Sequence, residues 1–367
     1  MRASSTVGTP LCEPILKYHN FGNNQLAIIS TIYPKQNSLI PTTNPIATIL
    51  LTVSSSKSTP PSIAYLGPSG TFTEEALLTQ QDLTNSSHEL CHSIAEVLER
   101  TANNAVTLGF TAIENSIEGT VNVALDSLIF KHDLFIQREV VLDVRLHLLG
   151  QPGASIDQIT QVISFPVATA QCRRYLNEHL SQAVEVAATS TAAAAQEIAK
   201  TKDLTSAAIG TSLSQKLYGL KFIASDIADH SENQTRFVIV AHSGVPAPTG
   251  NDKTSIVVFQ RSDQSGSLMG ILAEFAARSI NLTKLESRPT KKTLGDYCFL
   301  IDLEGHIDDE LVADCLTSIM AKHGDMKFLG SYPAATKKAN QQKNALSKTW
   351  TDAKTQIDKL RSQVSPS

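Results

Sequence analysis

The stretch Ile63–Ala76, IAYLGPSGTFTEEA, joins a short apolar run to the start of a helix. The run has the length of a buried strand, and Gly67 and Gly70 allow a tight turn after it. Thr71 and Glu74 have the spacing of a capping box, which predicts that a helix begins here. A strand, a tight turn and a helix form the repeating unit of an α/β fold. On its own, such a turn is more often an ordinary connection than the ligand site that its free helix amides would suit.

The same alternation continues toward the C-terminus. HELCH, SIAEVLERTAN and VTLGFTAI read as strand, helix and strand, and further pairs follow up to TSLSQKLYG. Between residues 142 and 150, LDVRLHLLG alternates strictly between apolar and polar side chains. This pattern predicts a half-buried strand at the point where the chain crosses to a second lobe. We therefore expect a parallel or mixed sheet with covering helices.

Residues 1–61 differ in composition from the rest of the chain. They are rich in Ser, Thr, Asn and Pro, Glu13 is their only acid, and they end in a linker-like SSSKSTPPS. Few acids and many hydroxyls are typical of an organellar transit peptide, but Arg2 is the only arginine. A disordered extension and a mis-assigned start are the alternatives. We predict neither a fold nor chemistry for this segment.

The bulk composition excludes several classes of protein. The 367 residues, 41% of them hydrophobic, suggest two or three domains, and a net charge of -4 gives no nucleic-acid footprint. The five cysteines form no CxxC pair, which favours a reducing cytoplasm over a disulfide framework. The ten histidines lack metal-ligand spacing, so no tightly bound metal is expected. No apolar run reaches the roughly 18 residues of a membrane span.

A smaller unit is predicted over residues 253–333. Its pattern reads βαββαβ, the ferredoxin-like arrangement, and its first helix carries apolar residues at helical spacing. The tail 334–367 has a short heptad stripe formed by Leu346, Trp350, Ala353, Ile357 and Leu360. A helix docked on its own domain is the favoured interpretation of this stripe, ahead of a contact between subunits.

Polar side chains stand at the ends of several predicted strands. Glu114–Ser116 follow an apolar strand, Gln171 lies at the start of a helix, and Thr235 and Arg236 precede the apolar FVIV. Ligands of open α/β sheets bind beyond the carboxyl ends of the strands. Each cluster alone has an ordinary explanation: a polar turn, a solvated glutamine, or an arginine that snorkels to water. Their occurrence in one α/β pattern favours a ligand cleft.

The motifs GPSGTFTEEA, IENSIEGTV, STAAAA and NQTRF resemble, in order and spacing, those of prephenate dehydratases. GSLMGILAEFAARSINLTKLESRP resembles the phenylalanine-binding ACT domain that follows the catalytic domain in that family. The resemblance covers about residues 62–333. Through ESRPT and GHIDDE, the sequence is most similar to the actinobacterial branch of the family. Two positions depart from the family pattern: Phe165-Pro166-Val167 replaces the usual His-Pro-Gln, and Ala112 stands where proline is frequent.

The resemblance implies a fold and a domain organisation. The catalytic domain, residues 62–241, would resemble type II periplasmic-binding proteins in having two lobes. Lobe 1 would comprise about 62–141 with 226–241, and lobe 2 about 142–225. A regulatory ACT domain over 253–333 and the helical tail would follow.

The resemblance also implies a reaction: prephenate would lose CO2 and its ring hydroxyl to give phenylpyruvate, without a redox cofactor or metal. Thr235 would act on the leaving hydroxyl as hydrogen-bond donor or proton relay, helped by Glu114, and Arg236 would anchor a carboxylate. The side chains implied in substrate binding are Thr71, Asn115, Ser116, Gln171, Ser190 and Phe237.

Phenylalanine would act as feedback inhibitor. The effector site would combine the helix start at Gly266, Ser267 and Leu268, the strand start at Asn281 and Leu282, and the ESRP residues Glu286, Ser287 and Arg288. The family binds its effector between subunits, so a homodimer or homotetramer is implied. Two rivals stay open: arogenate dehydratase, with the same chemistry on an amino-acid substrate, and a non-catalytic amino-acid sensor.

Overall fold

The computed structural model describes residues 16–21, 25–30, 60–260, 264–292, 295–335 and 341–363. The chain divides into two compact units, Met1–Thr59 and Pro60–Ser367. In the first unit, β1 (Leu16–Phe21) and β2 (Gln25–Ser30) pair as antiparallel strands. Most of the predicted N-terminal extension lies outside the described residues, so its assignment stays a prediction.

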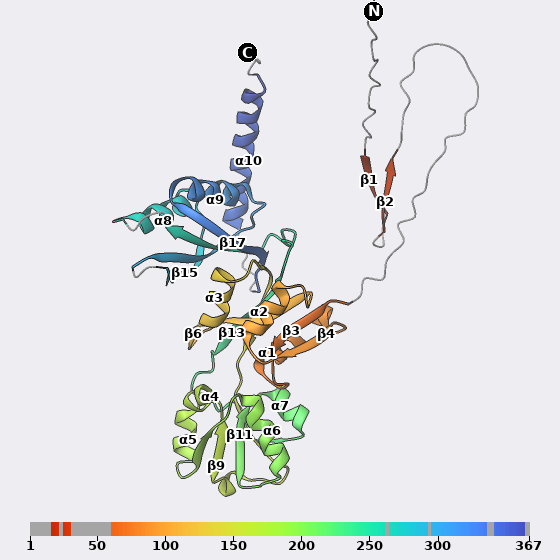
Figure 1. Cartoon of the computed structure of the whole chain (residues 1–367), viewed down its shortest axis with the longest axis vertical. Coiled ribbons are helices and arrows are strands. Elements are labelled where there is room, and N and C mark those ends of the chain that lie inside the picture. The colour runs from red at the N-terminus through yellow and green to blue at the C-terminus, as the bar shows by residue number, and fades with distance from the viewer. Residues whose placement is uncertain are drawn as a thin grey trace, which may run out of the picture. The chain divides into compact units, whose positions relative to one another are not determined.

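Lobe 1 of the second unit contains a six-stranded sheet in the order β4-β3-β5-β13-β7, with β6 paired to β5 (Figure 1). β3, β4 and β5 run parallel, whereas β13 runs antiparallel to β5 and β7 because it returns from the other lobe. The elements are β3 (Ser62–Leu66), α1 (Phe72–Leu78), a 3₁₀ turn at Gln81–Leu83, β4 (Ser87–Cys91), α2 (Ile94–Ala102), β5 (Leu108–Asn115), β6 (Gly119–Thr120), α3 (Asn122–Phe130), β7 (Phe135–Asp143) and β13 (Gln234–Ala241).

Lobe 2 contains a five-stranded sheet in the order β10-β9-β11-β8-β12. β9, β10 and β11 are parallel, and β8 and β12 extend the sheet in antiparallel fashion. The elements are β8 (His147–Gly150), a 3₁₀ turn at Ile156–Gln158, β9 (Gln161–Ser164), α4 (Pro166–Ala170), α5 (Arg173–His179), β10 (Val184–Ala187), α6 (Thr191–Thr201), β11 (Ser206–Gly210), α7 (Ser212–Tyr218) and β12 (Lys221–Ala224).

The structure differs from two local predictions in this lobe. One of the further helices expected before TSLSQKLYG, in the segment ATAQCRRYLNEHL, is interrupted between α4 and α5. There the carbonyl of Gln171 accepts a hydrogen bond from the Asp229 amide at 2.7 Å, so it does not extend the helix. LDVRLHLLG is split between β7 and β8, and His147, expected on a solvated face, is only 6% exposed. β8 lies between β11 and β12 in a sheet that is covered on both faces at this point, so all four of its residues are buried.

The third part of the second unit, residues 252–333, is called the C-terminal unit below. It has the predicted βαββαβ order, and its sheet has the strand order β15-β16-β14-β17. Its helices bury Ile271, Phe275, Cys315, Leu316 and Ile319 against the sheet, which is the helical spacing expected from the sequence. Its elements are β14 (Asp252–Gln260), α8 (Ser267–Ala277), β15 (Leu282–Pro289), β16 (Tyr297–Glu304), α9 (Glu310–Lys322) and β17 (Gly324–Pro333).

The C-terminal unit shares a hydrophobic core with lobe 1. Val238 and Val240 of β13 pack in one cluster with Val257, Leu300 and Tyr332 of the C-terminal sheet. One face of the lobe 1 sheet is therefore partly covered by the C-terminal unit.

The tail forms α10 (Gln341–Arg361), which contacts α9 through an ion pair between Lys354 and Glu310. This contact agrees with docking on the chain's own domain, although Trp350, Ile357 and Leu360 of the heptad stripe stay exposed. Within the described residues, no helix is long and apolar enough to span a membrane.

Candidate active site

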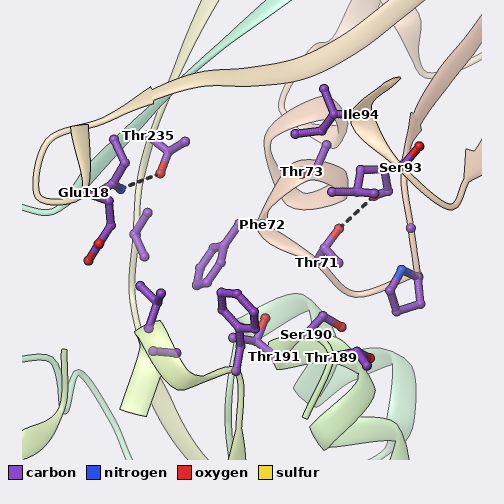
Figure 2. A pocket seen from close by; sticks show the side chains of 18 of the residues that line it. Thr71, Phe72, Thr73, Ser93, Ile94, Glu118, Thr189, Ser190, Thr191 and Thr235 are labelled. Carbon is purple, nitrogen blue, oxygen red and sulfur yellow. Dashed lines mark hydrogen bonds between the residues drawn. The ribbon is translucent and has the colours of Figure 1, made fainter. Parts of the chain in front are cut away.

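A cleft of about 890 Å³ lies between the two lobes, and side chains of both line it (Figure 2). Strand ends and helix starts surround it, as expected for an α/β sheet. Of the residues predicted from the sequence, the structure brings together here Thr71, Asn115, Gln171, Ser190 and Thr235. Figure 2 shows Thr235 across the cleft from Thr71, with Phe72 between them in this view.

Several helices begin at the cleft. The hydroxyls of Thr71, Ser93 and Ser190 accept hydrogen bonds from backbone amides at the starts of α1, α2 and α6, at 3.3, 3.1 and 2.9 Å respectively. Phe165 and Val167, which replace the family's polar residues, lie at the start of α4 and also line the cleft. Helix N-termini carry partial positive charge and free amides. None of the described lining residues is Lys or Arg, so these termini contribute positive potential to the cleft wall.

Asn115 and Thr235 form the cleft pair. They lie directly opposite one another on β5 and β13, and Asn115 Nδ2 donates to Thr235 Oγ1 at 2.9 Å. Figure 2 draws this bond at Thr235. Both side chains line the cleft, so a rigid two-strand scaffold holds the predicted catalytic hydroxyl at the ligand-facing edge of the sheet.

The sequence prediction missed Glu118, which lines the cleft and is labelled in Figure 2. Its Oε1 accepts a hydrogen bond from Gln171 Nε2 at 3.0 Å, so a carboxylate of lobe 1 meets an amide of lobe 2. Asn233 also lines the cleft and donates to Gln171 Oε1 at 3.0 Å. The polar run ENSIEG was the available signal for Glu118, since a turn after Asn115 can return a side chain toward the same edge.

Glu114 and Arg236 form the interface pair, and the structure does not place either in the cleft. They too lie opposite one another on β5 and β13, one residue along from the cleft pair. Their side chains point to the C-terminal unit: Glu114 Oε1 lies 2.9 Å from Lys284 Nζ, and Arg236 Nη1 lies 2.6 Å from Asp302 Oδ2. The expected carboxylate anchor is corrected on this point, because neighbouring residues of a strand face opposite sides of a sheet.

The guanidinium of Arg236 has partners at both of its terminal nitrogens. Its side chain is 12% exposed, and Nη2 donates to the Tyr332 hydroxyl at 2.9 Å. Burial opposes its charge, but Tyr332, Asp302 and Glu139 together raise the pKa of Arg236 well above its ordinary value. It is therefore a permanent cation that joins lobe 1 to the C-terminal unit.

Two more predicted substrate residues lie elsewhere. Phe237 is 1% exposed and stacks on Phe110 in the core of lobe 1, with ring centroids 5.3 Å apart, so it does not line the cleft. Ser116 Oγ accepts from the Gln234 amide at 2.9 Å and donates to the Glu232 carbonyl at 3.4 Å. Its hydroxyl thus holds the segment that leads into β13 and is not offered to a ligand.

The predicted effector residues fall into two groups. Gly266, Ser267 and Leu268 lie at the start of α8, and Asn281 and Leu282 lie where β15 begins. Ser267 Oγ accepts from Gln260 Nε2 at 2.7 Å.

The ESRP residues reach the other domain. Glu286 Oε2 accepts from Thr120 Oγ1 at 2.6 Å, and Arg288 Nη2 lies 2.5 Å from Asp126 Oδ1, both on lobe 1. Ser287 stays exposed. Two of the three predicted ESRP effector residues therefore sit on an interdomain contact.

Cys91 lines the cleft, but burial raises the pKa of its thiol, which disfavours a nucleophilic thiolate. Among the residues the structure describes, no group of three or more His, Cys, Asp or Glu side chains could hold a metal ion.

Two family models match parts of this chain. The family model described as prephenate dehydratase matches residues 63–244, and the ACT domain model matches residues 254–319. A prephenate dehydratase of Mycolicibacterium vanbaalenii is 40% identical over 292 residues, which cover 74% of this chain and 91% of the relative. The chain belongs to the prephenate dehydratase family. The resemblance predicted from the sequence is thereby confirmed, and the C-terminal unit is an ACT domain.

Solved structures confirm the two-domain α/β fold. The prephenate dehydratase of Arthrobacter aurescens, solved in complex with L-Phe, has a TM-score of 0.70 and 35% identity, covering 80% of this chain and 99% of that one. A protein described as GqqA, of a novel type of quorum quenching acylases, aligns with a TM-score of 0.67 and 27% identity, covering 74% of this chain and 97% of that one. Because the fold is shared by proteins named for different activities, the site residues carry the functional assignment.

Proposed function

We propose that the cleft binds prephenate and converts it to phenylpyruvate, the decarboxylating dehydration of the prephenate dehydratase family. The bond to the ring carboxylate breaks, CO2 leaves, and its electron pair enters the ring while the ring hydroxyl departs. A proton must reach that oxygen so that it leaves as water. Aromatisation drives the reaction, and the barrier lies in the poor leaving group.

The position of Thr235 carries this proposal. Its hydroxyl lines the cleft and is held by Asn115 at 2.9 Å on a buried strand. A hydroxyl so fixed can donate to the leaving oxygen, and general acid help of this kind is worth about 10²–10⁴-fold in rate. The raised pKa of Cys91 disfavours a cysteine nucleophile in the cleft.

The substrate's two carboxylates need positive partners. Arg236 cannot be one of them, because its side chain points to the ACT domain and does not line the cleft. The starts of α2 and α6, with the hydroxyls of Ser93 and Ser190, supply amides and partial positive charge inside the cleft. Gln171, on the lobe 2 side, adds an amide. We assign the carboxylates to these groups in place of Arg236.

We further propose that L-phenylalanine binds the ACT domain and inhibits the reaction, in an oligomeric enzyme of the cytoplasm. The complex of the Arthrobacter aurescens relative with L-Phe supports the effector. The contacts of Glu286 and Arg288 with lobe 1 offer a route from the effector motif to the catalytic domain. The buried free cysteines Cys91, Cys172, Cys298 and Cys315 suit a reducing compartment.

Arogenate is the second candidate substrate. It carries an ammonium group where prephenate has a ketone, and Glu118 places a carboxylate in the cleft. Phe165 and Val167 also remove the polar side chains usual in the family, so the substrate fit can differ.

The test is turnover of each substrate by the purified full chain, with phenylpyruvate and phenylalanine measured as the respective products. We expect prephenate to have the larger kcat/KM, and the Thr235→Val variant to serve as the matched control without the hydroxyl. Preference for arogenate would replace the first assignment by the second. Turnover of neither would overturn both.

A further inference from the structure

Five polar side chains form one continuous hydrogen-bonded chain in the cleft. Gln171 Nε2 donates to Glu118 Oε1 at 3.0 Å, and Asn233 Nδ2 donates to Gln171 Oε1 at 3.0 Å. Asn115 Nδ2 then donates both to Asn233 Oδ1 at 2.8 Å and to Thr235 Oγ1 at 2.9 Å. The chain starts on lobe 1, crosses to Gln171 on lobe 2, and returns through Asn233 to the proposed catalytic hydroxyl.

Backbone geometry fixes the direction of every bond in this chain. Asn115 Oδ1 accepts from the amides of Ile117 and Glu118 at 2.9 and 3.0 Å. A backbone amide can only donate, so the atom it meets is the carbonyl oxygen of Asn115, and the NH2 group must face the other way. Asn233 then presents its oxygen to Asn115 and its NH2 group to Gln171. Gln171 in turn presents its NH2 group to the Glu118 carboxylate.

This polarity determines what Thr235 can do. Its oxygen already accepts a hydrogen bond from Asn115 Nδ2, and a threonine hydroxyl has one proton of its own to donate. Within the part of the chain that the structure describes, that proton has no acceptor at hydrogen-bond distance, and the side chain lines the cleft. The proton is therefore available to a ligand.

Asn233 is one of the residues that join the two lobes. It is 1% exposed and lies on the segment that returns from β12 to β13. Its backbone carbonyl also accepts a hydrogen bond, at 2.7 Å, from the backbone amide of Val144, which lies on the other segment that connects the lobes. One buried residue thus joins both connections and both halves of the hydrogen-bonded chain.

We infer that Asn233 is a positioning residue that acts through Asn115 and Gln171 to hold the Thr235 proton toward the substrate. The inference rests on the proposed function, in which that proton reaches the leaving oxygen. It requires the Asn233 side chain to accept a hydrogen bond from Asn115 and to donate one to Gln171. An isosteric side chain that can only accept must therefore disturb the hydrogen-bonded chain.

Asn233→Asp is the informative variant. An ionised carboxylate at 233 still accepts from Asn115, but it forces Gln171 to turn its NH2 group toward 233. The Gln171 oxygen then faces the Glu118 carboxylate, and two acceptors meet. Protonation at 233 or 118 relieves this conflict, and so does Glu118→Gln, whose amide can donate to Gln171.

The experiment is a cycle of four proteins: wild type, N233D, E118Q and N233D/E118Q. For N233D we expect kcat at pH 8 to fall roughly 10- to 100-fold, the effect of one buried hydrogen bond left unmade. It should recover as pH falls, through an ionisation absent from the wild type. The double variant should lose that ionisation and match E118Q. A wild-type pH profile for N233D, or no rescue by E118Q, overturns the inference.

Asn233→Ser gives an independent arm if N233D does not fold. Serine is too short to reach Gln171, so kcat should fall at every pH without a new ionisation. Wild-type kcat in N233S overturns the inference.

Thermal unfolding of the same proteins needs no turnover. N233D should gain stability as pH falls, because a carboxyl whose folded pKa is raised binds its proton more tightly in the folded state. E118Q should remove this gain. An inactive wild type with this coupling intact would reject the proposed function alone, whereas an active wild type without it would reject only the role of Asn233.

Discussion

Two pairs of residues lie side by side on the same two strands and serve different ends. The cleft pair, Asn115 and Thr235, lines the cleft, and its two neutral side chains form a hydrogen bond of 2.9 Å. The interface pair, Glu114 and Arg236, faces the ACT domain and joins a network of charges there. One residue along each strand separates the pair proposed for catalysis from the pair that contacts the ACT domain. Predictions that separate kcat from stability therefore test whether this division holds.

The largest effect is expected in the cleft pair. Thr235→Val, which keeps the shape and removes the hydroxyl, should lower kcat about 10²–10⁴-fold, because the leaving oxygen loses its donor. The measurement is steady-state kinetics with prephenate, accompanied by thermal unfolding. Thr235→Ser is the matched control and should retain most of the rate. An equal loss of kcat in Arg236→Lys, with unchanged stability, would erase the distinction between the pairs.

Breaking the interface pair's network should reduce stability. Asp302→Ala leaves the buried Arg236 without its 2.6 Å partner, and such a loss costs about 3–5 kcal/mol in the free energy of unfolding. The folded variant should keep a kcat near that of the wild type, since neither residue lines the cleft. Denaturant unfolding checks the first point and initial rates the second. Asp133→Asn is the control: its pair with Lys327 is 93% exposed on the carboxylate side, so little change is expected.

Interdomain contacts of the effector motif should transmit inhibition. Arg288→Ala removes the ion pair with Asp126, so inhibition by phenylalanine should weaken, within the 5- to 150-fold range of typical allosteric coupling. Uninhibited kcat and phenylalanine binding, followed by calorimetry, should change little. Arg278→Ala, which breaks pairs within the ACT domain alone, is the control. Loss of binding itself in R288A would make Arg288 an effector ligand and not a coupler.

The smallest effect concerns pH. Burial raises the pKa of Glu286, but hydrogen bonds from Thr120 and Arg288 outweigh it and lower the pKa below its ordinary 4.5. A carboxyl group whose pKa is lowered by folding stabilises the folded state fully at pH values above its ordinary pKa. This contribution is lost as the pH falls through the lowered pKa. Glu286→Gln should flatten this acid-side decline, by about 2 °C or less in Tm. An unchanged acid slope would indicate that the interface contributes no net electrostatic stability.

The sequence predicted the elements well where the pattern was local. The βαββαβ order and the helix capped by Thr71 follow from periodicities that neighbouring residues carry by themselves. The break at Gln171 and the burial of His147 did not follow, because partners distant in sequence decide them.

The same distinction explains the candidate site. Thr235 and Asn115 were predicted correctly as cleft residues, whereas Arg236 and Phe237 were assigned to the cleft with them. The alternation of side chains in TRFVIV already placed Thr235 and Phe237 on one face of the sheet and Arg236 on the other. It could not reveal that the ACT domain covers the face of Arg236, or that Phe110 covers Phe237.

The helix starts around the cleft have a consequence for the end of each catalytic cycle. The substrate enters with two negative charges and, once CO2 has gone, the organic product carries one. The helix dipoles of the cleft wall attract a dianion more than a monoanion, and the described lining residues include no lysine or arginine whose ion pair would have to be broken on departure. The loss of CO2 therefore weakens the electrostatic attraction between the cleft and the organic product, so the chemical step itself promotes product release.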